Sequence, residues 1–540
     1  MNEKVFNLID EPWIRVIDDA CRVDEVSLAE LFKNAHQYKD LCGEIPTQDF
    51  ALLRFLLAIL HTVVSRFDMD GKMSPIEDDE TALDRWKEIW NAGKFPDKVI
   101  SDYLESQHES FYLFHPERPF YQCEHAKVGT SYTTAKLYGN LSESNNKVRM
   151  FSMLSGEEKN VMTFSEAARW LIYVNAFDDT SAKKSSESKA LGLELPSVGV
   201  GWMGKLGLLC VSGNNLFETL ILNLILVNEN GYSEERPIWE LEKMPDGERI
   251  PVAMPDNLAQ LYTLQSRRLY LKREEQKVIG FYLLGGNFFD KENAFIEPMT
   301  IWKNSGNKNN NSYIPKRHDI SRQFWRDFSA LVVSTDKSHK PGVVSWINRL
   351  DEENILEDRI LDFKIASVQY GDKDFFVTNV FSDSFQFHSS LISEMNSMWQ
   401  NMICDCVEFS DEIAKKVWIL AKNINLASGG NEVNTSKNFA DKAKSDFYIR
   451  IDLPFRKWLC AIDPEADNAY DKKIKWREEC VKIARQFGND IICNIDSSAI
   501  FGKGKFVDKE KNKTEIKKTI YSAAKAMNIF IAQLKKEESK

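Results

Sequence analysis

The hydrophobic pattern of the chain changes near residue 380, and this change constrains the fold more than any other feature. Before it, short alternating segments at residues 206–211 and 278–284 predict strands, and helical segments lie between them. After it, apolar residues recur every three or four positions over long stretches, which is typical of helices with one buried face. We therefore predict a mixed α/β domain over residues 1–380 and a helical domain over residues 381–540.

The helical pattern fills four stretches, at residues 384–426, 436–460, 469–493 and 514–534. In the last of them, Ile516, Ile520 and Ala523 begin a series that keeps one face apolar. Four long helices with short links favour an antiparallel bundle, because each helix then buries its stripe against its neighbours. The predicted fold class is α+β, with a large mixed α/β N-terminal domain followed by a C-terminal antiparallel four-helix bundle.

Charge and cysteine content exclude several classes of protein. The 540 residues include 70 Lys and Arg and 81 Asp and Glu, so a general basic coat for nucleic acid is excluded. Nine cysteines are too few for a disulfide scaffold of this length. The most apolar run, residues 50–64, is interrupted by Arg54 and His61 and is shorter than the ~20 residues of a membrane span. We expect a cytoplasmic protein without a signal peptide or membrane segment.

Two segments resemble phosphate-binding motifs. Residues 199–204 match G-x-G-x-x-G, but Pro196 interrupts the segment before them, and a predicted strand rather than a helix follows. A loop that approaches another backbone closely is therefore favoured over a dinucleotide site. Residues 502–519 carry seven lysines and three acids but lack the Ser or Thr of a phosphate-binding loop. They are either a phosphate contact or a solvated loop.

Candidate metal and catalytic residues are sparse. Cys123 with His125 forms one tight pair, and Cys404 with Cys406 lies on a predicted helix, whereas zinc requires paired ligands from two such places. Buried structural side chains are favoured at both positions. The chain contains neither the G-x-S-x-G nor the H-E-x-x-H motif. We therefore predict no metal, no cofactor and no catalytic residue.

Six segments occur in an order that is specific as a set. They are NLIDEPWIRV, LFHPERPF, FSEAARWLIYVNAFD, GNNLFETLILNL, LYTLQSRRLYL and FYIRIDLPFRKWL. Together with the helical C-terminal domain, they resemble the CasA family, the large subunits of type I-E CRISPR Cascade surveillance complexes. The resemblance covers nearly the whole chain.

The resemblance implies a DNA-recognition subunit that is not an enzyme. In this family the N-terminal domain reads a protospacer-adjacent motif in double-stranded DNA, largely through the minor groove, and opens the first base pairs for crRNA pairing in an R-loop. The helical domain stabilises the displaced strand, and the subunit recruits a helicase-nuclease. The implied partners are the backbone subunits, the small-subunit dimer, the crRNA 5′-end subunit, the target duplex and the helicase-nuclease.

The resemblance also points to DNA-binding residues. The segment around Gly199 and Gly201 resembles the family's glycine loop, and Lys291 matches a lysine that enters the minor groove. Residues 370–375 match the family's wedge hairpin, which gives Tyr370, Lys373 and Asp374 as candidates. The tip departs from the family, whose best-known wedge carries amide side chains there. In this chain the tip holds Asp372 and Asp374, which phosphates would repel. Either the wedge uses Lys373 and its aromatic neighbours, the alignment is shifted, or the segment is a simple hairpin turn.

Two further sets complete the predicted sites. Lys159 and Asn160 lie in a polar loop that resembles a mobile family loop in contact with the crRNA 5′ end, although an ordinary surface loop is equally compatible. A basic patch for the duplex is predicted from Lys183, Lys184, Lys189, Lys303, Lys308, Lys316 and Arg317. The competing hypotheses are a purely structural scaffold subunit and a nucleotide-dependent enzyme that uses the loop at Gly199 or the loop at residues 502–505.

Overall fold

The computed structural model describes residues 3–143, 148, 154–180, 199–227, 231–241, 255–287, 289, 291–305, 313–332, 339–356, 359–430, 435–507 and 517–538. The chain forms two compact units. Unit 1 comprises Met1–Ser321, Val333–Glu357 and Leu361–Ser384, and unit 2 comprises Arg322–Val332, Asp358–Ile360 and Phe385–Lys540. The boundary expected after residue 380 falls inside one long strand, β13 (Val377–His388).

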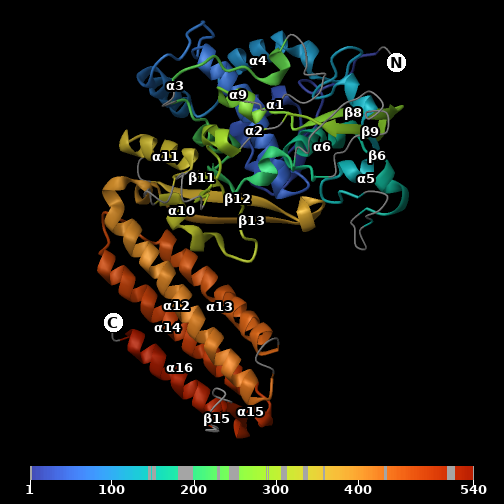
Figure 1. The fold of residues 1–540 in the computed structure, drawn as a ribbon. Helices are drawn as coiled ribbons and strands as arrows, with labels where there is room; N and C mark the ends of the chain where they lie inside the picture. Colours follow the sequence, from blue (N-terminus) through green and yellow to red (C-terminus); the bar gives the residue numbers. More distant parts are fainter. Residues whose placement is uncertain are drawn as a thin grey trace. The chain divides into compact units, whose positions relative to one another are not determined.

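The core of unit 1 is built around helix α2 (Pro46–Arg66). Pro46 occupies its first turn, where a missing N–H costs nothing. Helices α6 (Phe164–Phe177) and α9 (Leu258–Tyr262) pack on α2 (Figure 1). By length and composition alone α2 could cross a membrane, but 94% of its most apolar stretch is buried inside the protein. The most apolar run of the sequence, residues 50–64, is thus part of a core helix.

Smaller elements surround this core. The other described helices of unit 1 are α1 (Leu28–Asn34), α3 (Asp79–Ala92), α4 (Asp97–Ser106), α5 (Thr134–Leu137), α8 (Leu216–Leu222) and α11 (Gly342–Glu352). Two-stranded sheets pair β1 (Val5–Asn7) with β5 (Tyr112–Phe114) and β10 (Trp302–Asn304) with β11 (Tyr313–Pro315). One three-stranded sheet has the strand order β3 (Val23–Val26), β2 (Ile14–Ile17), β4 (Asp40–Leu41). Another has the order β6 (Thr130–Thr133), β9 (Lys277–Gly285), β8 (Arg267–Glu274).

A third three-stranded sheet positions the candidate site. Its order is β13, β12 (Ile360–Tyr370), β7 (Leu208–Ser212), and β7 runs antiparallel to β12 with Cys210 opposite Lys364. All five residues of β7 are buried. A short 3-10 turn at Asp372–Asp374 joins β12 to β13. The strands predicted at residues 206–211 and 278–284 are confirmed as β7 and β9.

Unit 2 is mainly helical. Its long helices are α12 (Ser397–Ala427), α13 (Thr435–Cys460), α14 (Ala469–Cys493) and α16 (Ala523–Glu538), which lie side by side in Figure 1. Helix α12 packs against the other three, and buried Trp476 of α14 donates a hydrogen bond to Ser410 Oγ of α12 at 3.0 Å. Helices α10 (Ser329–Val332) and α15 (Ser497–Phe501) and strands β14 (Lys503–Val507) and β15 (Lys517–Tyr521) complete the unit.

Two predicted helices of this unit begin later than expected. The helix expected from residue 384 begins at Ser397, because β13 continues to His388 and buries the alternate residues Phe385 and Phe387. The helix expected from residue 514 begins at Ala523, because Lys517–Tyr521 pairs antiparallel with Lys503–Val507. The basic segment after Gly502 is therefore a strand pair over its described residues, not a loop.

Glu235 of unit 1 predicts a pH dependence of stability. Burial raises the pKa of Glu235 to about 7, while its carboxylate accepts a hydrogen bond from the Ala259 N–H at 2.6 Å. At a pH between the ordinary pKa of a glutamate and this raised value, Glu235 has lost its proton in the unfolded chain but keeps it in the folded chain. Stability therefore falls as pH rises through this window, by less than the limiting ~1.4 kcal/mol per pH unit. We expect Glu235→Gln to reduce this fall in urea unfolding measured at pH 5 and pH 8. An equal fall in Glu235→Gln and in the exposed control Glu105→Gln would contradict the assignment.

Candidate nucleic-acid interface

The glycine segment, residues 199–204, lies against the end of α6. Gly199 has a left-handed φ of +71°, which favours glycine. At Gly201 an added Cβ would lie 2.3 Å from the Ala176 carbonyl oxygen, and the Gly201 N–H donates to Asp178 O at 2.9 Å. The segment continues into a 3-10 turn and then into β7. It lacks the following helix that a dinucleotide site needs, so the close-approach interpretation is favoured.

A buried ion network holds this segment from one side. Arg267, at the start of β8, donates from Nε to Asp178 Oδ2 at 2.6 Å and from Nη2 to Gly199 O at 2.8 Å. Lys136 Nζ lies 3.1 Å from Asp178 Oδ1 and 2.8 Å from Asp179 Oδ2, and all four side chains are almost fully buried. Burial opposes ionisation of Asp178, but Lys136 and Arg267 outweigh it and hold its pKa below the usual value. Arg267, whose charge is paired with a buried aspartate, therefore holds the glycine segment in place through the Gly199 carbonyl.

A second buried pair holds the other side. Arg54 of α2 meets Glu297 in a bidentate ion pair, with distances of 2.7 and 2.9 Å. Glu297 Oε2 also accepts a hydrogen bond of 2.8 Å from the indole Nε1 of Trp202. Trp202 directly follows Gly201 in the glycine segment. The Arg54 and Glu297 side chains are 2% and 0% exposed, so the pair joins the core helix to the glycine segment. This explains why an arginine interrupts the apolar run of α2.

The tip of the β12–β13 hairpin, residues 370–376, is anchored beside the same segment. The backbone N–H of Thr180 donates to Asp374 O at 3.0 Å, and its Oγ1 donates to Lys373 O at 3.1 Å. The guanidinium of Arg317 holds the Asp374 carboxylate with two bonds of 2.8 and 3.0 Å. Lys373 is exposed and has a φ of +55°. The negative charge of Asp374 is therefore offset within the protein.

Tyr370 supports the tip from inside. Its hydroxyl donates to Phe177 O at 2.7 Å, and the Arg317 guanidinium lies 5.2 Å from its ring centroid. A Cβ at Gly204 would lie 2.2 Å from the Tyr370 hydroxyl, and one at Gly207 would lie 2.0 Å from Lys316 O. Gly204 therefore lets the glycine segment approach the hairpin closely. Gly207 likewise lets the chain approach Lys316, the residue directly after β11.

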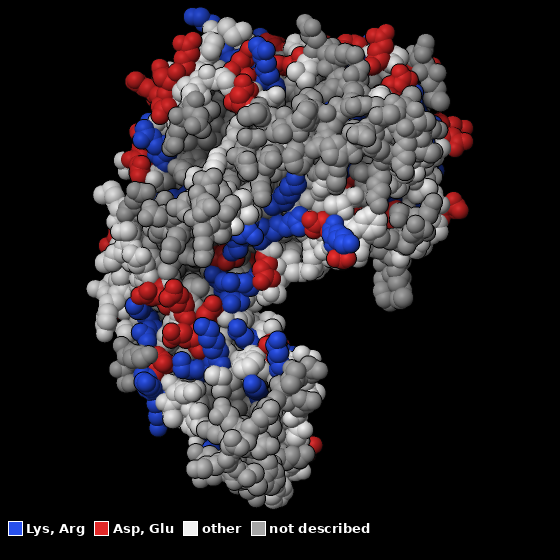
Figure 2. Space-filling model, viewed as in Figure 1, with Lys and Arg blue, Asp and Glu red and all other residues white. Residues whose placement is uncertain are grey.

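The structure brings together seven of the predicted residues: Gly199, Gly201, Lys316, Arg317, Tyr370, Lys373 and Asp374. Figure 2 shows Lys and Arg side chains gathered at the level of the β12–β13 hairpin, interrupted by a few acids. Sequence reasoning missed Lys136, Asp178, Arg267, Arg54 and Glu297. Of these five residues, Arg54 alone stood out in the sequence, as a single arginine within an apolar run.

Other predicted DNA-binding residues are less well placed. Lys183, Lys184, Lys189 and Lys308 lie outside the described residues, as does the side chain of Lys291. The 3-10 turn Lys291–Ile296 follows Phe289, whose ring meets that of Trp202 edge-on at 4.3 Å. Lys303 is exposed on β10, opposite Ile314 of β11. A role for these lysines stays a prediction.

The described part of the expected mobile loop is anchored. Residues 156–160 form a 3-10 turn with a capping box between Ser155 and Glu158. Lys159 Nζ pairs with the buried Glu143 carboxylate at 2.9 and 3.1 Å, and Asn160 Nδ2 donates to Glu157 Oε2 at 3.4 Å. A contact of Lys159 or Asn160 with crRNA stays a prediction.

The cysteine-containing pairs differ in burial, because Cys123 and Cys406 are buried and Cys404 is half-buried. Within the described ranges, no three His, Cys, Asp or Glu side chains are grouped as metal ligands. Burial raises the pKa of both Cys404 and Cys406 to about 12. Thiols that stay protonated are poor nucleophiles, which favours the structural interpretation of Cys404 and Cys406.

Comparison with known proteins decides the family. The family model of CRISPR-associated protein Cse1 matches residues 7–487. The chain belongs to the Cse1 family. A curated relative, CasA/Cse1 of Thermus thermophilus, is 31% identical over 335 residues, which span 61% of this chain and 60% of the relative. The resemblance to the CasA large subunits of type I-E Cascade is confirmed.

Solved Cse1 structures share the fold over the full length. Thermobifida fusca Cse1 gives a TM-score of 0.83 at 28% identity, covering 99% of this chain and 98% of that one. Acidimicrobium ferrooxidans Cse1 gives 0.78 at 21% identity, covering 100% of both chains. A chain of a CRISPR RNA-guided surveillance complex gives 0.69 at 14% identity, covering 98% and 99%. The mixed helix-and-sheet class is that of Cse1 structures.

Proposed function

We propose that this Cse1-family large subunit recognises a protospacer-adjacent motif in double-stranded DNA and helps to open the duplex, without catalysing a reaction. It would work in the cytoplasm with the crRNA-loaded backbone subunits, the small-subunit dimer and the crRNA 5′-end subunit. Its long C-terminal helices would form the family's antiparallel four-helix bundle and stabilise the displaced strand. The helicase-nuclease would then be recruited to the opened target.

One observation carries this proposal: two buried ion networks fasten the glycine segment beside an anchored hairpin tip. Gly199 is part-exposed, whereas residues 200–204 of the segment are buried. The rigid backbone at Gly199, which carries no side chain, would therefore make the close approach to the minor groove, whose edges distinguish few base pairs. Lys373 and Lys316 add positive charge next to it, as phosphate contacts require. Base pairing with the crRNA would read the rest of the target sequence.

The direct test is a titration of target duplex with the crRNA-loaded complex, assembled with and without this chain. The proposal predicts tighter binding with the chain, and about threefold weaker binding when Lys373→Ala removes one phosphate contact. Lys98→Ala, on the exposed surface of α4, is the matched control. Equal affinity with and without the chain would favour the scaffold alternative, and thermal stabilisation of the chain by ATP or NAD would favour the enzyme alternative.

The Arg317–Asp374 pair predicts a gain of affinity. The pair is about one-third exposed, at 34% and 38% for the two side chains, so its loss should change stability by less than ~1 kcal/mol. Asp374→Asn removes a negative charge and releases Arg317 toward phosphate. We expect duplex affinity to rise about threefold and the salt dependence to steepen by about one counterion.

The measurement for this variant is duplex affinity at several salt concentrations, with Asp70→Asn in an exposed loop as control. A loss of affinity at unchanged stability would mean that Asp374 orders the tip more than it opposes DNA.

A further inference from the structure

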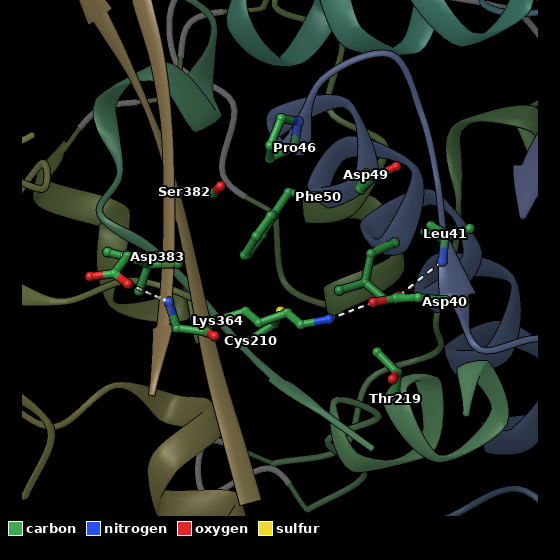
Figure 3. Close-up of a pocket in the computed structure, with 13 residues that line it drawn as sticks. Asp40, Leu41, Pro46, Asp49, Phe50, Cys210, Thr219, Lys364, Ser382 and Asp383 are labelled. Carbon is green, nitrogen blue, oxygen red and sulfur yellow. Dashed lines mark hydrogen bonds and ion pairs between the residues drawn. The ribbon is translucent and has the colours of Figure 1, made fainter. Parts of the chain in front are cut away.

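A cavity of about 290 Å³ opens in unit 1 on the shaft of the β12–β13 hairpin. Figure 3 shows that it lies between the start of α2, strand β4 and the two hairpin strands. Its volume is close to the lower end of the range typical of small-ligand sites. None of the roles proposed above uses it.

The walls of the cavity combine apolar side chains with an excess of acid. Phe50 and Leu53 of α2 and Ile365 of β12 supply buried apolar surface. The charged residues of the lining are three aspartates, Asp40, Asp49 and Asp383, and one lysine, Lys364. Lys364 reaches across to form an ion pair with Asp40 (Figure 3). The lining therefore contains more acidic than basic side chains, which disfavours an anionic ligand.

Asp49 lies in the first turn of α2 and is one of the acids that line the cavity. Its Oδ1 accepts a hydrogen bond from the Gly43 N–H at 2.7 Å. Burial raises the pKa of Asp49 to about 7, with help from the nearby carboxylates Asp40 and Glu44. The Gly43 hydrogen bond and the more weakly acting Lys364 oppose this rise but do not prevent it. Glu44 is itself paired with Arg169. A carboxyl with these neighbours is stabilised in its charged form by a cation placed beside it.

We propose that this cavity binds a small organic cation, with an ammonium group beside Asp49 and an apolar body against Phe50 and Leu53. An apolar wall with a few convergent polar groups is the usual composition of such sites. The ammonium takes the place of the proton on Asp49, so binding strengthens as that carboxyl ionises. The other titratable groups at the cavity, Asp40, Lys364, Cys210 and Asp383, line its remaining sides.

In the test, isothermal titration calorimetry measures the binding of 2-phenylethylammonium to the full chain. The neutral 2-phenylethanol and the anionic 3-phenylpropionate have a similar body and serve as matched controls. We expect the cation to bind more tightly than either control, and its affinity to rise about tenfold from pH 6 to pH 8, as a carboxyl with a pKa near 7 ionises.

Two variants locate the binding. Asp49→Asn removes the charge and should weaken binding about tenfold, the loss expected for one ion pair of ~1.4 kcal/mol. Ser382→Trp adds bulk at a lining residue outside the buried core, and should abolish binding even if Asp49→Asn folds poorly. Asp102→Asn on α4 should leave binding unchanged.

Three outcomes overturn the proposal. Equal binding of all three probes would show an unselective apolar cavity. Cation binding that survives both Asp49→Asn and Ser382→Trp would place the site elsewhere. If none of the probes binds, the cavity is not a site for a small organic cation. A basic side chain of a partner subunit, which is a different class of ligand, would then be the candidate occupant.

Discussion

Replacing Arg54 by leucine will lower the free energy of unfolding of unit 1 by about 3–5 kcal/mol, the usual loss when one member of a buried ion pair is removed. The Glu297 carboxylate would then stay buried without its bidentate partner, while still accepting hydrogen bonds from Trp202 Nε1 and the Met299 N–H. The leucine itself suits the apolar surroundings of α2. The loss therefore reflects the stranded charge and not a poorly packed side chain.

The measurement is urea unfolding followed by circular dichroism, with the transitions of the two units analysed separately. The double variant Arg54→Leu with Glu297→Leu should recover much of the loss, because no buried charge is left unpaired. Arg22→Leu breaks an exposed pair with Asp18 and should cost far less, because solvent screens such a pair. A loss in Arg54→Leu no larger than in Arg22→Leu would show that the buried pair does not stabilise the unit.

Replacing Gly201 by alanine will weaken motif-dependent binding of target duplex by about tenfold or more, equivalent to ~1.4 kcal/mol. The new Cβ would lie 2.3 Å from Ala176 O and 2.8 Å from the Phe177 nitrogen, both of them backbone atoms. The glycine segment must therefore move away from α6, and its position relative to the hairpin tip changes with it.

Two other glycines allow a comparison, one inside the glycine segment and one far from it as the control. At Gly199 an added Cβ has room, with Lys205 Cε as its nearest neighbour at 3.7 Å, so Gly199→Ala costs only the left-handed strain of roughly 1–2 kcal/mol. Gly93 ends helix α3 with a φ of +66° and nothing within 4 Å of an added Cβ. Gly93→Ala should reduce stability similarly and leave DNA binding unchanged. Equal binding by Gly201→Ala and Gly93→Ala would separate the segment from motif recognition.

Elements with one strong local signal were predictable from the sequence. The buried helix α2 follows from its apolar run, and β7 and β9 follow from their alternation. The start of α12 was misplaced because Phe385 and Phe387 alternate within a segment whose later residues also fit a helical spacing. Strand β15 was missed because its partner β14 decides its structure, and pairing is not a local property.

The charges that hold the site together could not be predicted. Arg267 meets Asp178 across 89 residues of sequence, and Arg54 meets Glu297 across 243. In a chain with 81 acids, no spacing identifies such partners. For the same reason the sequence suggests that Asp374 repels DNA, whereas Arg317, 57 residues earlier, offsets its charge. Family resemblance found the glycine segment and the hairpin, but only the fold explains how they are held together.

A selection from a motif library shows whether the glycine segment of unit 1 reads the adjacent motif. The crRNA-loaded complex is assembled with the wild-type chain, with Gly201→Ala, or without the chain, and is offered target duplexes flanked by a randomised motif. We expect the wild-type complex to enrich a narrow set of motifs and the other two complexes to enrich none. The same enrichment without the chain, or with Gly201→Ala, would contradict it.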